Sequence, residues 1–153
     1  MHFGDHDRGK EELKRAIALN SSDPDTYKSL LGVLLYSGEI GSAIDAGEFL
    51  TQLQPDIPVH TAFNLGTAYL LADRAADAVR MLERSVERNP GNLYANVVLS
   101  AAYAAVGRQA DAQRLSEQVR QQFPTFSREQ FGSALRNPSL RGKLYHALQN
   151  AGL

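Results

Sequence analysis

The sequence predicts an all-α fold in which pairs of antiparallel helices stack into a solenoid. Two observations support this prediction. Tyrosines recur 34 residues apart, at Tyr69 and Tyr103, and prolines recur 35 and 34 residues apart, at Pro55, Pro90 and Pro124. A fixed period of this length is typical of stacked helical repeats, each of which needs its neighbours to bury its apolar face. The period therefore predicts the fold class before any single helix is placed.

The composition agrees with a folded domain and argues against several kinds of function. The 153 residues are 43% hydrophobic and 22% charged, which suits one globular domain. The net charge of −1 lacks the basic surplus of a nucleic-acid binder. The absence of cysteine excludes disulfides and thiolate metal sites. No apolar run approaches the ~18 residues of a membrane span, and the N-terminus lacks the apolar core of a secretion signal. We therefore expect a cytoplasmic protein that binds neither membrane nor nucleic acid.

Three full repeats follow from the period, at residues 24–58, 59–92 and 93–126. Their first helices are predicted at about 24–37, 59–72 and 93–106, and their second helices at about 40–53, 74–88 and 108–122. Gly66 and Ala78 are small enough for the two helices of a repeat to approach closely. Gly38 and Gly107 suit the turn between helices, where a left-handed backbone is often needed. Each proline follows a second helix, because the residue before proline avoids the α conformation.

The second repeat carries the clearest motif. It reads Asn64-Leu65-Gly66-Thr67-Ala68-Tyr69, followed by Ala78, Leu82 and Pro90. This pattern resembles the tetratricopeptide (TPR) repeat. The third repeat has Ser100 at the glycine position, and the first repeat has Leu31 and Leu34 at the glycine and tyrosine positions. The resemblance implies a right-handed α-solenoid in one domain, residues 1–153, with the first helices lining a concave groove.

Residues 7–20 are predicted to form a second helix whose first helix is missing. Gly4 aligns with the turn glycine Gly38, so this stretch corresponds to half a repeat. An orphan half-repeat suggests the C-terminal piece of a longer protein, because the end of a solenoid normally carries a polar cap. A natural start with an unusual cap is the alternative, since terminal repeats are often atypical.

Residues 127–153 are predicted to cap the other end with two helices. Ser127 and Gln130 fit a capping box for a helix running to about Arg136, and Asn137-Pro138 marks a second helix start. The second helix carries one apolar stripe, made of Leu140, Leu144, Ala147, Leu148 and Ala151. We expect this stripe to pack on the last repeat, although it could instead bind a partner.

The same tail carries a second resemblance. The residues are Phe123-Pro124-Thr125-Phe126-Ser127, then Asn137-Pro138, and finally Leu148-Gln149-Asn150-Ala151-Gly152-Leu153. They resemble the ends of bacterial class III adenylate/guanylate cyclases and of winged-helix regulators with C-terminal TPR arrays. The resemblance implies a regulatory module of a larger bacterial protein. It carries over no catalytic residue, because the cyclase catalytic segment is absent from this sequence.

The TPR resemblance also places a candidate binding site on the concave groove. The predicted groove residues are Lys28, Tyr36, His60, Phe63, Asn64, Thr67, Tyr94, Val97, Val98 and Ala101. Their apolar and aromatic character suits an amphipathic helix or an extended apolar segment of a partner protein. Two alternatives stay open: some of these side chains pack internally, or the chain's own N-terminus covers them.

The groove does not match the carboxylate clamp of chaperone-binding TPR domains. Lys28 and Asn64 occupy two of the five clamp positions, but Gly32, Tyr94 and Val98 occupy the others. These three cannot supply the missing charge-assisted hydrogen bonds. We therefore expect no binding to chaperone tails.

No catalytic or cofactor-binding motif emerges. His2, Asp5, His6 and Asp7 could hold a metal ion, but a frayed terminus with adventitious affinity is the favoured interpretation. The charged pair Glu83 and Glu87 has helical spacing and is interpreted as a solvated face.

The sequence therefore predicts a non-catalytic scaffold for protein–protein interaction, with no metal ion and no cofactor. The alternative function is an oligomerisation module that pairs parent chains, such as cyclase domains, as a homodimer. Binding of single-stranded RNA would need a basic groove, and Lys28 is the groove's one cation.

Overall fold

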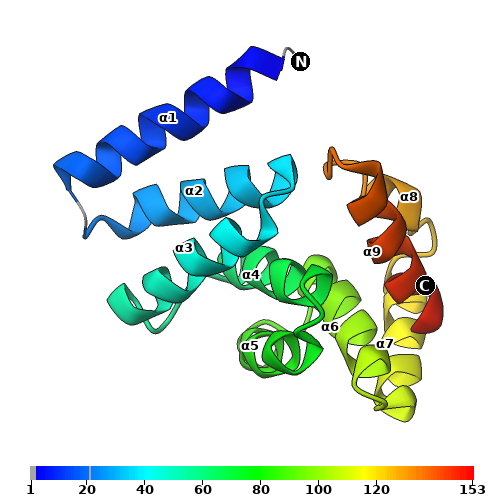
Figure 1. The fold of residues 1–153 in the computed structure, drawn as a ribbon. Coiled ribbons are helices and arrows are strands. Elements are labelled where there is room, and N and C mark those ends of the chain that lie inside the picture. Colours follow the sequence, from blue (N-terminus) through cyan, green and yellow to red (C-terminus); the bar gives the residue numbers. More distant parts are fainter. Residues whose placement is uncertain (1–2, 21) are drawn as a thin grey trace.

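The computed structural model describes residues 3–20 and 22–153, with side chains from residue 7 onward, and over this part of the chain it contains helices and no strand. The helices are α1 (Phe3–Leu19), α2 (Pro24–Ser37), α3 (Ile40–Leu53), α4 (Val59–Leu71), α5 (Ala75–Arg88), α6 (Leu93–Ala105), α7 (Gln109–Gln122), α8 (Arg128–Phe131) and α9 (Pro138–Asn150). Figure 1 shows them stacked in chain order, as an all-α solenoid. None of the described helices is both long and apolar enough to span a membrane.

The three central helix pairs are α2–α3, α4–α5 and α6–α7. Each helix lies within one residue of its predicted start and end, which confirms the helix assignments made from the period. Local sequence explains several of the starts. The Asp23 carboxylate accepts hydrogen bonds from the backbone N–H groups of Asp25 and Thr26, and the Asn92 side chain accepts one from Ala95. Such caps satisfy amides that have no partner inside the helix.

The turns between paired helices use a left-handed residue at equivalent positions. Gly38 has φ +89° and Gly107 has φ +84°, which confirms the role predicted for both. The second repeat departs from this rule, because Asp73 occupies the equivalent position with φ +59°. Aspartate tolerates this region better than most residues with a side chain, but it is less favourable there than glycine.

Close helix packing within the second repeat depends on glycine. A Cβ atom at Gly66 would lie 2.7 Å from Leu82 Cδ1, and one at Gly47 would lie 2.5 Å from Leu65 Cδ1. Both distances are too short for carbon atoms in contact. Gly66 therefore allows α4 and α5 to approach as predicted, and Gly47 does the same for α3 and α4.

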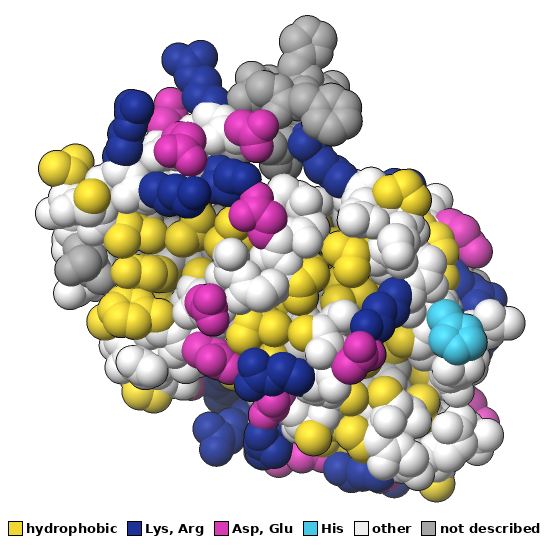
Figure 2. Space-filling view, viewed as in Figure 1, with side chains coloured by type: hydrophobic (Ala, Val, Ile, Leu, Met, Phe, Trp, Pro, Cys, Tyr) yellow, Lys and Arg dark blue, Asp and Glu magenta, His cyan; other side chains and the backbone are white. Residues whose placement is uncertain are grey.

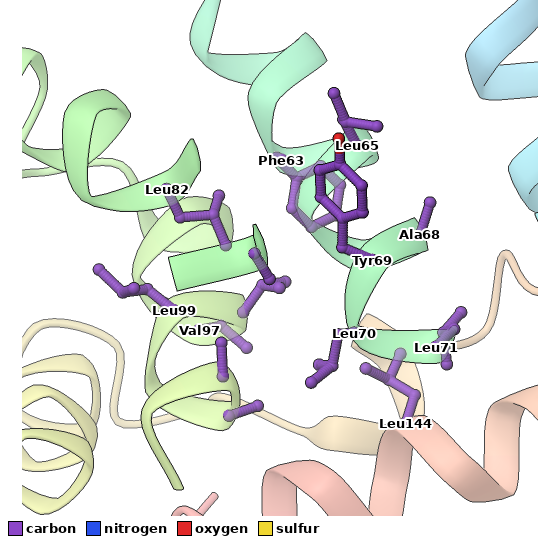
Figure 3. Packing of buried hydrophobic residues seen from close by; sticks show 14 of the residues in the cluster. Phe63, Leu65, Ala68, Tyr69, Leu70, Leu71, Leu82, Val97, Leu99 and Leu144 are labelled. Atoms are coloured by element: carbon purple, nitrogen blue, oxygen red, sulfur yellow. The ribbon is translucent and has the colours of Figure 1, made fainter. Parts of the chain in front are cut away.

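The hydrophobic core runs through the middle of the array. Leu65 and Leu82 are fully buried, and Val97 and Leu99 of α6 pack in the same cluster. Figure 3 shows Leu82, Val97 and Leu99 between α4, α5 and α6, whereas Leu65 points away from them, toward Gly47 of α3. Because α4 and α6 have neighbours on almost every side, they are apolar over most of their circumference.

The junction between the first two full repeats has a polar cluster. Glu48 Oε1 of α3 accepts hydrogen bonds from the Tyr69 hydroxyl and from Arg74 Nη2, both at 3.0 Å. Arg74 Nε also donates to Asp77 Oδ2 at 2.8 Å, and its guanidinium lies 4.7 Å from the Tyr69 ring centroid. Burial raises the pKa of the Tyr69 phenol, which therefore stays a donor. Tyr69 therefore fills the space where one repeat stacks on the next.

The following junction repeats the same arrangement with Tyr103, Glu83, Arg108 and Asp111. The Tyr103 hydroxyl donates to Glu83 Oε1 at 2.8 Å, and Arg108 Nη1 donates to the same oxygen at 2.9 Å. Arg108 Nε donates to Asp111 Oδ2 at 2.8 Å. We call each set of four residues a junction cluster. The interpretation of Glu83 as a solvated face is wrong, because this carboxylate reaches across to the next repeat.

The first helix also corrects a predicted boundary. α1 begins at Phe3, whereas the alignment of Gly4 with a turn predicted a helix from residue 7. α1 packs on α2, and Lys10 forms an ion pair with Glu39 there. This junction therefore has an ion pair in place of the four-residue junction cluster.

The C-terminal segment, residues 127–153, departs further from expectation. Ser127 caps α8 by accepting from the backbone N–H of Gln130 at 3.3 Å, as predicted. The helix ends at Phe131, however, and does not continue to Arg136. A Cβ atom at Gly132 would lie 2.5 Å from Tyr145 Cε1 of α9. α8 therefore ends next to the position where the chain comes into close contact with α9.

Candidate protein-binding site on the concave face

The ten predicted groove residues lie along the first helices, α2, α4 and α6, but most of them are not open to a partner. Six are buried, namely Phe63, Asn64, Thr67, Val97, Val98 and Ala101. Tyr94 is 52% exposed, His60 is exposed, and Lys28 and Tyr36 are partly buried. Lys28 lies apart from the aromatic residues and forms a 2.9 Å ion pair with Asp25. The predicted site is therefore only partly accessible.

The C-terminal segment covers much of this face. α9 packs on α6 and also reaches α4, and its own Leu144 and Leu148 side chains are buried in this contact. Figure 3 shows Leu144 close to Leu70 and Leu71 at the end of α4. The apolar stripe packs on α6 of the last repeat, as expected, and it also reaches α4 of the preceding repeat. The C-terminal segment lies over the groove, whereas the described part of α1 packs on α2.

Contacts at both ends hold the C-terminal segment in place. The backbone N–H of Arg136 donates to Tyr36 O at 3.2 Å, and the Asn137 side chain caps α9 beside the turn at Gly38. At the other end, Gln109 Nε2 donates to Asn150 O at 3.0 Å. α9 therefore runs from the end of α2 across α4 to the start of α7.

An open aromatic pocket remains at the starts of α4 and α6. The ring centroids of Phe63 and Tyr94 lie 5.4 Å apart, and each lies 5.8 Å from the ring of Phe131 in α8. Phe126 lies 5.8 Å from Phe131 on the other side. These separations are within the range of favourable ring contacts. We define the aromatic pocket by Phe63, Tyr94, Phe126, Phe131 and the neighbouring Tyr36.

The aromatic pocket has the size and character of a binding site. Its cavity measures about 560 Å³, within the range typical of ligand pockets. Its walls contain no Asp, Glu, Lys or Arg among the residues that the structure describes. Polar atoms come from Ser127, Gln130 and His60 at the sides. An uncharged apolar side chain with adjacent peptide groups fits this chemistry.

A row of polar side chains borders the pocket toward α2. The Tyr36 hydroxyl donates to Asn64 Oδ1 at 3.1 Å, and Asn64 Nδ2 lies 3.5 Å from His60 Nε2. Burial raises the pKa of Tyr36, so its hydroxyl stays protonated at neutral pH. Asn64 is 4% exposed and is engaged with Tyr36, so it orients the pocket wall and is not free to bind a partner directly.

The described side chains include no group of three or more His, Asp or Glu residues placed to hold a metal ion. His2 lies outside the described residues, as do the side chains of Asp5 and His6. The N-terminal cluster seen in the sequence is therefore not located by the structure.

Comparison with solved structures identifies the fold. The crystal structure of MamA superposes with a TM-score of 0.75 at 21% sequence identity, covering 97% of this chain and 87% of MamA. MamA 41-end from Desulfovibrio magneticus RS-1 gives a TM-score of 0.75 at 15% identity, covering 97% and 85%. YrrB, described as a TPR protein with an unusual peptide-binding site, gives 0.73 at 21%, covering 97% and 77%. This chain has the TPR fold. No protein family model matches the sequence of this chain, and no curated protein matches it either.

Sequence reasoning missed two groups of residues in the TPR array. Phe126 and Phe131 belong to the aromatic pocket, and the grouping of Phe123, Phe126 and Phe131 around the end of the last repeat could have indicated it. The junction clusters also left a signal, because Arg74 and Arg108 are 34 residues apart. What the period could not show is where the C-terminal segment folds, since it lies outside the repeat.

Proposed function

We propose that this chain is a non-catalytic protein-interaction scaffold that binds an extended apolar segment of a partner protein in the aromatic pocket. The observation that carries the proposal is the half-exposed ring of Tyr94, which lies against Phe63 and Phe131 in an uncharged cavity. An exposed aromatic side chain with other rings behind it is typical of an interaction hot spot. The TPR fold agrees with this role, and one similar structure is described as having a peptide-binding site.

The shape of the open site favours an extended segment over a helix at this place. The pocket lies between the starts of α4 and α6 and the loop before α8, which leaves room for one or two bulky side chains. Polar groups of His60 and Gln130 at the sides can bond peptide groups of an extended chain. The proposed contact residues are thus Tyr36, His60, Phe63 and Tyr94 of the predicted groove, joined by Phe126 and Phe131.

Selection from a displayed library of random twelve-residue peptides tests the proposal. We expect selected peptides to share a bulky apolar residue and to lose at least tenfold in affinity for the Tyr94→Ala variant. Val106→Ala is the matched control, because Val106 is an apolar residue that is 39% exposed outside the pocket. Peptides that bind Tyr94→Ala as tightly as the unmodified chain would refute the pocket as the binding site.

A second function, self-association, is favoured by apolar side chains at the opposite end of the array. Leu19 is 90% exposed, and Phe49 lies with its ring centroid 4.7 Å from that of Tyr27. Figure 2 shows hydrophobic side chains gathered on this face below the charged side chains of α1. Such a patch could pair two chains, as the resemblance to the ends of cyclases and winged-helix regulators implies. Sedimentation of Phe49→Glu beside the unmodified chain tests this, since only the latter should dimerise.

A further inference from the structure

Another cavity lies between the second helices α3 and α5, and it shares no residue with the aromatic pocket. It measures about 370 Å³, which is enough for one bulky side chain. Its apolar walls include Ile57 and Ala62, which are buried, and Met81, which is partly buried. Three arginines of α5 line the same cavity, and we call it the arginine cavity. They are Arg80, Arg84 and Arg88.

The three arginines are four residues apart and therefore share one face of α5. The other two second helices lack this row. The equivalent positions are occupied by Asp45, Phe49 and Leu53 in the first repeat and by Arg114, Gln118 and Gln122 in the third. A feature that stacking requires would recur from one repeat to the next. The row of arginines is therefore not a requirement of the array, and it suggests a role specific to this cavity.

The arginine cavity has positive charge that is not compensated by its own residues. Arg84 is exposed, and it makes no hydrogen bond or ion pair within the described part of the chain. Asp77 is the one acidic residue among the described walls of the cavity. Its two carboxylate oxygens already accept hydrogen bonds from Arg74 and Arg80. Arg84 is therefore available to an anionic group from outside.

A buried hydroxyl lies beside the arginine cavity. Ser85 is 1% exposed, and its Oγ has no hydrogen-bond partner among the described residues. It lines an adjoining cavity of about 270 Å³, which shares Ile57 and Arg88 with the arginine cavity. The equivalent residues, Leu50 and Val119, are apolar and buried. Because buried polar groups nearly always have a partner, a hydroxyl at this position indicates that a polar group can bind nearby.

We propose that the arginine cavity binds an acidic segment of a partner protein, in which carboxylates flank a bulky apolar residue. The apolar side chain packs on Ile57 and Met81. A carboxylate accepts hydrogen bonds from Arg84, since the planar guanidinium matches the geometry of a carboxylate. A second carboxylate replaces Asp56 at Arg88, because the Asp56 side chain is 84% exposed and such a pair is weak.

This second site does not rest on the proposed function, because it is built from the second helices and not from the aromatic pocket. Selection from a fully random library of displayed twelve-residue peptides tests it, with Tyr94→Ala as the receptor so that the aromatic pocket contributes little. We expect enriched peptides to combine two or more Asp or Glu residues with a Leu, Phe or Met. Labelled synthetic copies of these peptides are then the probes for fluorescence anisotropy.

The affinity of the probes should fall by about tenfold for Arg84→Gln, the effect of losing hydrogen bonds from a charged donor. This substitution should leave the fold intact, because Arg84 has no described partner, and circular dichroism checks it. Raising the NaCl concentration should weaken binding to the receptor more than to Arg84→Gln, since salt screens the lost interaction.

Arg80 and Arg114 provide a matched pair of variants. Arg80 pairs with Asp77, and Arg114, at the equivalent position of the third repeat, pairs with Asp111 in the same way. Arg80→Gln should weaken binding by about threefold, less than Arg84→Gln because Arg80 is already paired. Arg114→Gln should leave the affinity unchanged, because it lies outside the arginine cavity.

Three results would overturn the inference. The selection enriches no acidic peptides, or the enriched peptides bind Arg84→Gln as tightly as the receptor. In the third, inorganic phosphate displaces the probes at a concentration equal to theirs, which makes the cavity a site for small anions and not for a protein segment. Failure of the proposed function is distinguishable, because it concerns peptides that bind the unmodified chain and depend on Tyr94.

Discussion

The junctions between repeats and the contact between the array and the C-terminal segment bury similar side chains but are built differently. Each of the two inner junctions combines apolar packing with a junction cluster, and the same four residue types recur at both. The contact under α9 buries Leu144 and Leu148, and Gln109 and Arg120 of α7 donate hydrogen bonds to the backbone carbonyls of Asn150 and Gly152, both at 3.0 Å. The junction clusters join side chains of neighbouring repeats to one another, whereas the hydrogen bonds at the end of α9 run from side chains of α7 to backbone carbonyls. The helix array and its C-terminal cover, residues 127–153, are therefore held together by a different kind of polar contact from that between repeats.

The largest effect is expected from a cavity inside the array. Leu65→Ala removes a fully buried side chain between α3 and α4 and should lower the free energy of unfolding by about 3–5 kcal/mol. The loss should appear as one cooperative transition in urea, because the repeats depend on each other. A stable array with only local loss of helix would contradict this.

A cavity beneath α9 should destabilise only the C-terminal segment, residues 127–153. Leu148→Ala should cost about 2 kcal/mol, at the low end for this substitution, because α9 lies at the edge of the fold and its neighbours can relax. Hydrogen exchange should accelerate in residues 127–153 and stay unchanged in α4 and α6. Equal acceleration in all helices would show that the cover and the array unfold together.

Breaking a junction cluster should have a smaller effect. Glu83→Gln removes the charge that accepts from Tyr103 and Arg108, and the Tm should fall by about 2 °C. Glu48→Gln should give the same change at the preceding junction, since its contacts are equivalent. Glu87→Gln is the control, because Glu87 lies one turn away and is exposed. Unequal results for Glu48 and Glu83 would mean that the junctions are not equivalent.

The last prediction has no effect at neutral pH. Burial and the hydrogen bond to Glu83 raise the pKa of Tyr103 to about 12, whereas an unfolded tyrosine titrates near pH 10. The unfolded state therefore releases its proton first, and the stability present below pH 10 is lost as the pH rises toward 12. Urea unfolding from pH 8 to 11 should show a shallower decline for Tyr103→Phe than for the unmodified chain. Tyr145→Phe serves as the control, and identical slopes for all three proteins would refute the assignment.

Prediction from sequence succeeded where the determinants are local and periodic. Gly66 and Tyr69 could be interpreted because the same roles recur one period later, and Gly38 could be interpreted because a turn needs a left-handed residue. The binding site was predicted less well. Val97, Val98 and Ala101 were expected to face a partner, but they are buried while Tyr94 stays exposed. An amphipathic stripe such as that of α9 shows that one face of the helix must be buried, but it does not show which surface buries it.

The sequence by itself therefore determined the helices, their pairing and the direction in which they stack, because each of these depends on residues one turn or one repeat apart. Only the tertiary structure decided which part of the concave face is open. That outcome depends on where the non-repeating C-terminal segment docks, and on Gly132 allowing α8 to fold against α9 beside Phe63 and Tyr94. Apolar burial is non-directional, so the pattern of leucines in α9 does not specify the surface on which this helix packs.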